Sequence, residues 1–234
     1  GLTMTIERKL LGTSPSGGAA DVAEVFSTDL WAASTTTDST ETINNGLDLS
    51  GEGGLVWIKN RNEDYDHRLT DTERGIQKQL KTNDTAAQNA YTKETVSAFN
   101  SNGFSSTVFQ NNTYVSWTFR KKKKFFDVVT WTGNGVAGRG IAHGLGGPVG
   151  MLIVKCTSHA QNWAVWHKGI PNTHYLRLNS TNASNSGSTY WNNTTPTNTV
   201  FTVGTDHEVN VSGKTYVAYL FADNSAEDAE DQMI

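Results

Sequence analysis

Apolar and polar residues alternate along much of the chain with the two-residue period of a β-strand. Val115, Trp117 and Phe119 alternate with Ser116 and Thr118, so the three apolar side chains share one face of this segment. We therefore expect a half-buried strand here, with its aromatic row turned toward a core.

Other segments are apolar without interruption. The run 151–154 is bounded by Gly150 and Lys155 and is too short for a stable helix, so it predicts a core strand. The other strands that we predict are 26–31, 54–59, 126–131, 163–166, 175–178, 200–203 and 215–221. The pattern leaves room for one short helix, at 72–80 or at 86–98.

Three of these segments occur twice in the same order, about 100 residues apart. The matched pairs are 26–31 with 126–131, 54–59 with 150–155, and 113–119 with 215–221. Insertions and deletions in loops explain the small drift in spacing. We predict an N-terminal arm or linker at 1–23, a first β unit at 24–124, a second β unit at 125–224, and an acidic tail or linker at 225–234.

Composition supports an all-β fold. Hydrophobic residues make up 36% of the chain, below the usual figure of about 45–50%, and Thr, Asn, Ser and Gly fill the difference. Many short strands joined by such polar turns predict an antiparallel β-sandwich or jelly roll, built here from two related units. The 7 Trp, 7 Tyr and 9 Phe suit half-buried pleated surfaces.

Charge and hydropathy narrow the possible partners. The formal net charge of −4 gives no overall basic field, so we expect no nucleic acid partner. No apolar run approaches about 18 residues, and the N-terminal sequence lacks the order of a signal peptide. We expect that the protein does not insert into a membrane. We also expect that it is made in a host cytoplasm. The lone Cys156 allows no intrachain disulfide and is expected to be a buried small residue, in preference to a nucleophile.

One block of charge stands between the two predicted units. Lys121 to Lys124 follow Arg120 without interruption. Such a block could contact a polyanion, either DNA or phosphate on lipopolysaccharide. The commoner interpretation is a solvated linker, because four lysines without interleaved aromatic or Arg residues read bases poorly.

A second polar cluster lies near the middle of the first unit. Its members are Asp64, Asp66, His67, Asp71 and Glu73. A calcium site would need oxygen ligands at a fixed spacing, which is missing here, so we expect a polar surface loop and neither a metal nor another cofactor. Asp71 and Arg74 could form an ion pair that closes the loop, with Gly75 in a tight turn.

The densest aromatic patch is the best ligand-binding candidate. Trp163 and Trp166 are three residues apart, so they face opposite sides of a strand and one of them should be core. Tyr190 and Trp191 precede a polar stretch that begins at Asn192. We expect these three residues to offer an exposed ring and amides to a sugar, with packing against a neighbouring subunit or against the other unit as the commoner alternative.

Several motifs together resemble a known family. In order, they are Gly54–Arg61, Asp71–Gly75, Phe99–Phe104, Ser116–Lys121, Phe125–Val129, Gly150–Lys155, Trp163–His167 and Trp191–Asn193. As a set they resemble repeat-containing proteins of marine bacteriophages and prophages, which are often described as tail or lectin-like proteins. The resemblance spans roughly residues 20–224. It implies a virion structural role and a concanavalin-like sandwich and supplies no catalytic residues. The four lysines depart from the shorter basic stretch of that family.

We weigh three functions against these features. The first is a non-enzymatic virion protein of a tail fibre, spike or other appendage, assembled with copies of itself, as a trimer in a fibre, and with other virion proteins. The second is a lectin-like module that binds host surface glycans. The third is a polysaccharide depolymerase, which needs two converging carboxylates about 5–10 Å apart. Its candidates Asp48, Glu52, Asp71 and Asp127 show no reason to converge in the sequence.

Overall fold

The computed structural model describes residues 21–223, and strands dominate this part of the chain. Each strand pairing within it is antiparallel, which confirms the prediction of an all-β fold consistent with a β-sandwich. The helices within residues 21–223 are the single turns α1 (Val22–Val25) and α2 (Ser188–Trp191). No helix in the described range could cross a membrane. The predicted arm at 1–23 and tail at 225–234 lie outside this range, except that Asp21 caps α1 and residues 22–23 begin it.

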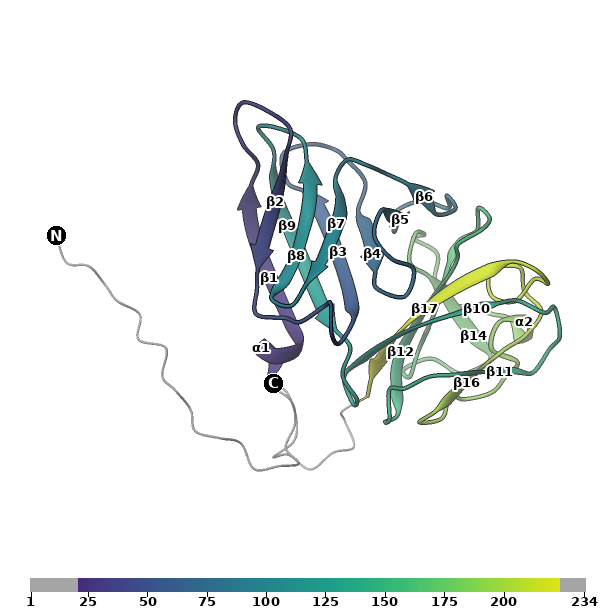
Figure 1. Ribbon diagram of the computed structural model, residues 1–234. Helices are drawn as coiled ribbons and strands as arrows, with labels where there is room; N and C mark the ends of the chain where they lie inside the picture. Colours follow the sequence, from purple (N-terminus) through teal and green to yellow (C-terminus); the bar gives the residue numbers. More distant parts are fainter. Residues whose placement is uncertain (1–20, 224–234) are drawn as a thin grey trace.

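Two six-stranded sheets form the centre of the molecule. The first runs β1 (Phe26–Ala32), β9 (Thr113–Arg120), β3 (Gly54–Asn60), β4 (Arg68–Asp71), β5 (Lys78–Lys81) and β6 (Asn89–Ala90). The second runs β10 (Phe126–Thr132), β17 (Thr215–Ala222), β12 (Val149–Cys156), β13 (Trp163–His167), β14 (His174–Arg177) and β15 (Asn185–Ser186). Figure 1 shows the strands of residues 26–120 beside those of residues 126–222.

Two smaller sheets lie on the outer faces of this pair. One contains β2 (Ser39–Asn44), β8 (Gly103–Val108) and β7 (Thr95–Asn100), and the other contains β11 (Arg139–Ala142) and β16 (Val200–Val203). Residues such as Val56 and Phe104 fill the core between the first large sheet and its small sheet. Leu152 and Phe201 belong to the matching core of the second pair.

A third core joins the two large sheets. Leu69 and Leu80 from the first sheet meet Phe126, Ile153 and Trp163 from the second half of the chain, and all are buried. The molecule is therefore two sandwiches packed through their large sheets. This shared core fixes one half of the chain against the other.

The two large sheets have corresponding strand orders and registers. Trp31 pairs with Tyr114 in the first sheet, and Trp131 pairs with Tyr216 in the second. Each tryptophan stacks on its tyrosine, with ring centroids 4.5 Å apart in the first and 5.3 Å in the second. These correspondences support two related units. The duplication itself, its boundaries at 24–124 and 125–224, and the jelly-roll topology stay predictions.

The buried face of β9 is opposite to the expected one. Tyr114, Ser116 and Thr118 are fully buried, whereas Trp117 and Phe119 are only half-buried. The reason is the small sheet, which covers the Tyr114 face and needs small side chains to approach closely. In the second half, strand β13 is covered on both faces. Trp163 and Trp166 accordingly lie in different cores, and both are buried.

The short helix expected at 72–80 or 86–98 is wrong. The first range contains a turn followed by β5, and the second contains β6 and most of β7. Gly75 and Gln77 adopt positive φ angles of 91° and 61°, which a right-handed helix does not accommodate. Asp71 closes the turn by accepting the Gly75 N–H on its carbonyl oxygen at 3.0 Å.

Candidate functional site

A groove runs between the two halves of the molecule, along strand β10. It consists of two neighbouring hollows of about 730 and 400 Å³ that share Glu73 and Thr130 as lining residues. One wall is β10, from Phe126 to Thr132, and the facing wall includes the turn that carries Glu73 and Arg74. The groove depends on both halves, because the walls come from different sandwiches.

Strand β10 is an edge strand, so one side of its backbone faces the groove. Phe126 exchanges both backbone hydrogen bonds with Lys122, at 3.0 and 3.1 Å, on the side away from β17. Alternate residues of a strand direct their backbone groups to the same edge. Val128, Thr130 and Thr132 therefore also present their N–H and C=O groups away from β17.

Lysine residues form one end of the groove. The sequence predicts a solvated linker at Lys121–Lys124, whereas the structure has a compact turn there. The N–H of Lys121 bonds the carbonyl of Gly53 at 2.9 Å, and that of Lys124 bonds Leu145 at 2.7 Å. Lys122 and Lys123 are exposed and line the larger hollow.

The acidic residues in the groove are held by nearby cations. Lys121 Nζ lies 2.7 Å from Glu73 Oε1 and 3.3 Å from Asp127 Oδ1. Burial alone would lower the pKa of Lys121, but the hydrogen bond with Glu73 and the charge of Asp127 raise it above its usual value. Glu52 lies 3.6 Å from Arg120. Asp127 also accepts the N–H groups of Val128 at 2.9 Å and Gly144 at 2.6 Å.

A histidine also lines this end, with both ring nitrogens engaged. His143 Nδ1 accepts the Leu145 N–H at 3.3 Å, and Nε2 lies 3.2 Å from the carbonyl oxygen of Thr197. This pattern places the ring proton on Nε2. Burial lowers the pKa of His143, which favours the neutral ring. The groove therefore offers paired charges and hydrogen-bonding groups, without an unengaged base at His143.

The depolymerase candidates show no reason to converge in the sequence, but the structure brings two of them to one hollow. Glu52 and Asp127 line the same hollow. Asp48 instead caps a turn by accepting the Gly51 N–H at 2.8 Å. Asp71 is buried away from solvent with Arg74. The convergence depends on the packing of the two sandwiches, which a linear spacing does not encode.

The expected sugar platform at Tyr190, Trp191 and Asn192 is not exposed. Tyr190 is 3% exposed and Trp191 is 2% exposed, because α2 turns both rings into the second core. Trp191 Nε1 donates to the carbonyl oxygen of His174 at 3.1 Å, and Tyr175 stacks on Tyr190 with a centroid distance of 3.7 Å. Asn192 is exposed but adopts a left-handed backbone conformation that ends α2. The premise of an exposed aromatic ring here is wrong, since both rings pack intramolecularly.

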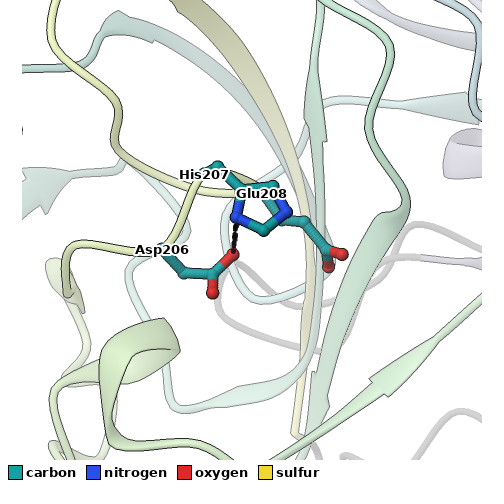
Figure 2. A group of neighbouring side chains, drawn as sticks. All are labelled: Asp206, His207 and Glu208. Carbon is teal, nitrogen blue, oxygen red and sulfur yellow. Dashed lines mark hydrogen bonds and ion pairs between the residues drawn. The ribbon is translucent and has the colours of Figure 1, made fainter.

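One group of metal-ligand side chains occurs in the described range, formed by Asp206, His207 and Glu208 within 4.8 Å of one another. Figure 2 shows His207 paired with Asp206, while the Glu208 carboxylate points away from that pair. The fully buried Glu208 already bonds Arg177 at 2.8 Å and Asn162 at 2.8 Å. A cation would have to displace these partners. The geometry therefore describes a structural ion pair.

The groove walls are held together by buried polar contacts that cross between the halves. Asp71 and Arg74 form the ion pair suggested by the sequence, at 2.6 Å. Tyr219 from the second half donates its hydroxyl to Asp71 at 2.8 Å and accepts from Arg74 at 3.3 Å. Burial raises the pKa of Tyr219 well above its usual value, so the phenol keeps its proton. No pattern in the sequence indicates this third partner, because Tyr219 lies 148 residues away from Asp71 along the chain.

A buried lysine makes a second connection. Lys155 is fully buried and donates to the carbonyl oxygens of Thr85 at 3.0 Å and Gln161 at 2.7 Å. Trp163 Nε1 donates across the same interface to the carbonyl oxygen of Lys81 at 2.8 Å. These bonds attach the loop that follows β5 to the second sandwich. Cys156 beside Lys155 is buried and unpaired, as expected for a small core residue.

Comparisons with known proteins give one match. No curated protein and no solved structure matches the chain. The model of the family described as "Domain of unknown function (DUF7483)" matches residues 21–226, which covers the two sandwiches. The chain therefore belongs to the DUF7483 family.

Proposed function

We propose that the chain is a non-enzymatic structural module of a bacteriophage particle, part of a tail fibre, spike or other appendage that takes part in host attachment. The virion assignment rests on the resemblance of its ordered motifs to phage and prophage repeat proteins. One structural observation carries the structural role, namely the core that joins two sandwiches into a single block. A rigid block with a polar exterior suits a component of a large assembly.

Self-assembly is part of this proposal. Leu30 on the edge strand β1 is 68% exposed, and its partner Val115 is half-buried. An apolar side chain on an unpaired strand edge is a suitable contact for a neighbouring copy. We therefore propose a homo-oligomer, trimeric in a fibre, that also contacts other virion proteins.

The proposal is tested by locating the protein in particles. Gold-labelled antibodies raised against the purified chain should mark a tail or head appendage of the virus that encodes it. Antibodies against a major capsid protein serve as the control for accessible particles. Absence of label on intact and detergent-opened particles, with the chain present only in the host lysate, would overturn a virion role.

The second candidate function is glycan binding, and the groove along β10 favours it. The groove combines exposed lysines, backbone edge groups and hydroxyl side chains in one concave surface. Depolymerase activity is less favoured, since Glu73 and Asp127 share the ammonium of Lys121 and Glu52 pairs with Arg120. A catalytic carboxyl group must be free to reach the scissile bond, whereas these carboxylates are already engaged by cations.

A further inference from the structure

We propose that the groove along β10 binds an acidic oligosaccharide, whose carboxylate or phosphate groups contact Lys122 and Lys123 and whose hydroxyls bond the strand edge around Thr130. This inference deepens the attachment role proposed above by naming a site and a ligand class. It rests on the backbone of β10, on the charge at one end of the groove, and on the side chains at the other.

The strand edge supplies hydrogen-bonding groups at fixed positions. Of the residues that face away from β17, Phe126 is bridged to Lys122, and the N–H of Val128 is taken by the Asp127 carboxylate. The carbonyl of Thr132 accepts from Arg139. Among the described residues, this leaves the carbonyl of Val128, both backbone groups of Thr130 and the N–H of Thr132 open to the groove.

This pattern disfavours an added β-strand as the ligand. Strand addition needs a run of free N–H and C=O groups on alternate residues of the edge. Here the run is short, because the Asp127 carboxylate takes the N–H of Val128 at one end and Arg139 takes the carbonyl of Thr132 at the other. A sugar ring needs only a few donors and acceptors, so the remaining groups suit hydroxyls better than a polypeptide backbone.

The lysine end of the groove supplies charge. Glu73 and Asp127 are paired with Lys121, whereas Lys122 and Lys123 form no ion pair within the described part of the chain. Both ammonium groups are exposed at the larger hollow. Charge-assisted hydrogen bonds from such groups to carboxylate or phosphate are stronger than bonds between neutral groups. The ligand should therefore carry negative groups at this end.

The other end of the groove is lined mainly by hydroxyl and amide side chains, beside Glu73, Arg74 and the exposed Lys78. Its members include Thr130, Thr132, Thr157, Thr215 and Gln88. Thr157 and Thr215 hold each other through their hydroxyls at 2.6 Å, which fixes part of this surface before any ligand arrives. Preorganised donors and acceptors cost less ordering entropy on binding. This end suits the neutral ring hydroxyls of a sugar chain.

Binding to the full 234-residue chain is measured by calorimetry with four probes. Three are acidic, namely hexagalacturonate, a sialic acid hexamer and a phosphorylated lipopolysaccharide core oligosaccharide, and maltohexaose is the neutral probe. At least one acidic probe should bind clearly more tightly than maltohexaose, with affinity that falls as salt is raised from about 50 to about 500 mM. A phosphate-bearing and a carboxylate-bearing probe together identify the charged group that the lysines prefer.

Two variants separate the two ends of the site. The double variant Lys122→Gln, Lys123→Gln should lower the affinity for the acidic probe by about tenfold or more. This decrease corresponds to the loss of one to two charge-assisted bonds. Thr130→Pro removes the free N–H of Thr130 without touching the ladder to β17, and should weaken binding several-fold. Thermal unfolding of each variant establishes whether the fold is retained. The lysine variant should keep the fold, because both of the replaced side chains are exposed.

The matched control is Arg61→Gln with Lys93→Gln, which removes the same charge from exposed residues outside the groove. This control variant should bind the acidic probe with an affinity within about twofold of that of the unmodified chain, since interactions between distant charges are largely screened. Failure of all three acidic probes to bind at millimolar affinity or better would overturn the inference, and so would equal losses in the control and groove variants. The inference would also be contradicted if double-stranded DNA bound the chain as tightly as the best oligosaccharide does. Antibody labelling of the appendage is unaffected by any of these results, so the structural role and the groove can fail separately.

Discussion

At the scale of single residues, buried polar side chains specify how the two sandwiches meet. Asp71 is fully buried, and its charge is balanced by Arg74 and by the Tyr219 hydroxyl from the other half. A buried carboxylate without partners is strongly unfavourable, so this network permits one relative placement of the two sheets.

Removing the charge of Asp71 should destabilise the protein strongly. Asp71→Asn leaves Arg74 buried without its counter-ion, and we expect a loss of about 3–5 kcal/mol in the free energy of unfolding. Tyr219→Phe should cost about 1.5–3 kcal/mol, because it removes a hydroxyl that is hydrogen-bonded to two charged groups. Urea unfolding followed by tryptophan fluorescence measures both. The control Asp66→Asn breaks a more exposed pair with Lys81 and should cost much less; an equal cost would contradict the role of the buried network.

The buried Lys155 makes stability depend on pH in a defined direction. Burial lowers the pKa of Lys155 from its ordinary value of 10.5 to about 8 in the folded protein. Between these two values the unfolded chain binds more protons than the folded one, so this residue makes stability rise with pH there. Below pH 8 both states are protonated and the cost of burying the charge is constant.

The difference between the protein and its Lys155→Met variant isolates this effect. From pH 8 to pH 10.5 the original protein should gain stability relative to the variant, on the order of 3 kcal/mol if the full pKa change is expressed. Chemical unfolding at a series of pH values gives the two curves, and effects of the tyrosines cancel in the difference. The variant Lys93→Met, at an exposed site, should show a flat difference, and a flat difference for Lys155→Met would refute the lowered pKa.

Residue roles were also the hardest to predict from sequence. The Asp71–Arg74 pair was predictable, because three-residue spacing and Gly75 suggest a closed turn. The burial of Tyr190 and Trp191 was not, because it depends on α2 turning both rings toward residues from distant strands. The groove could not be predicted at all, since its two walls belong to different sandwiches.

At the scale of strands, hydrophobic periodicity predicted the positions of the strands well. It predicted less well which face of a strand is buried. Each strand expected from an apolar run is present, for example β12 around residues 151–154 and β16 at Val200–Val203. The polar strands β2 and β8, which contain Thr and Ser at several positions, gave little signal. The wrong face was expected for β9, because its small side chains Ser116 and Thr118 let the covering sheet approach closely although they are polar.

Two tyrosines at equivalent positions of β9 and β17 make corresponding hydrogen bonds in the two halves. Tyr114 and Tyr216 each accept a backbone N–H from five residues upstream, Phe109 at 3.1 Å and Val211 at 2.8 Å. Tyr114 donates to Glu94 and Tyr216 donates to the carbonyl of His207. Burial raises the pKa of Tyr114 to about 12, so its hydroxyl keeps its proton at neutral pH.

Replacing either tyrosine with phenylalanine should cost a similar amount. Tyr114→Phe and Tyr216→Phe each leave a backbone N–H without its acceptor, with an expected loss of about 1–3 kcal/mol in stability. Urea unfolding of the two variants and of Tyr65→Phe, at an exposed position, tests this. A loss at one site with no change at the other would contradict equivalent roles for the two strands.

At the scale of the whole molecule, the shared core makes the two sandwiches one body. The large sheets bury Leu69, Leu80, Ile153 and Trp163 against each other. Separating the halves would expose this apolar surface and would break the bonds of Lys155 and Tyr219. The proposed structural role and the proposed glycan groove both require this fixed arrangement, since the groove exists only between the halves.

The most direct test of this arrangement is differential scanning calorimetry of the full chain. We predict one unfolding transition with a calorimetric enthalpy equal to the van't Hoff enthalpy, because the core between the large sheets couples the unfolding of the two halves. Asp71→Asn should move that single transition to lower temperature as a whole. Two separate transitions, with only one of them moved by Asp71→Asn, would show that the sandwiches fold and move independently and would contradict the account.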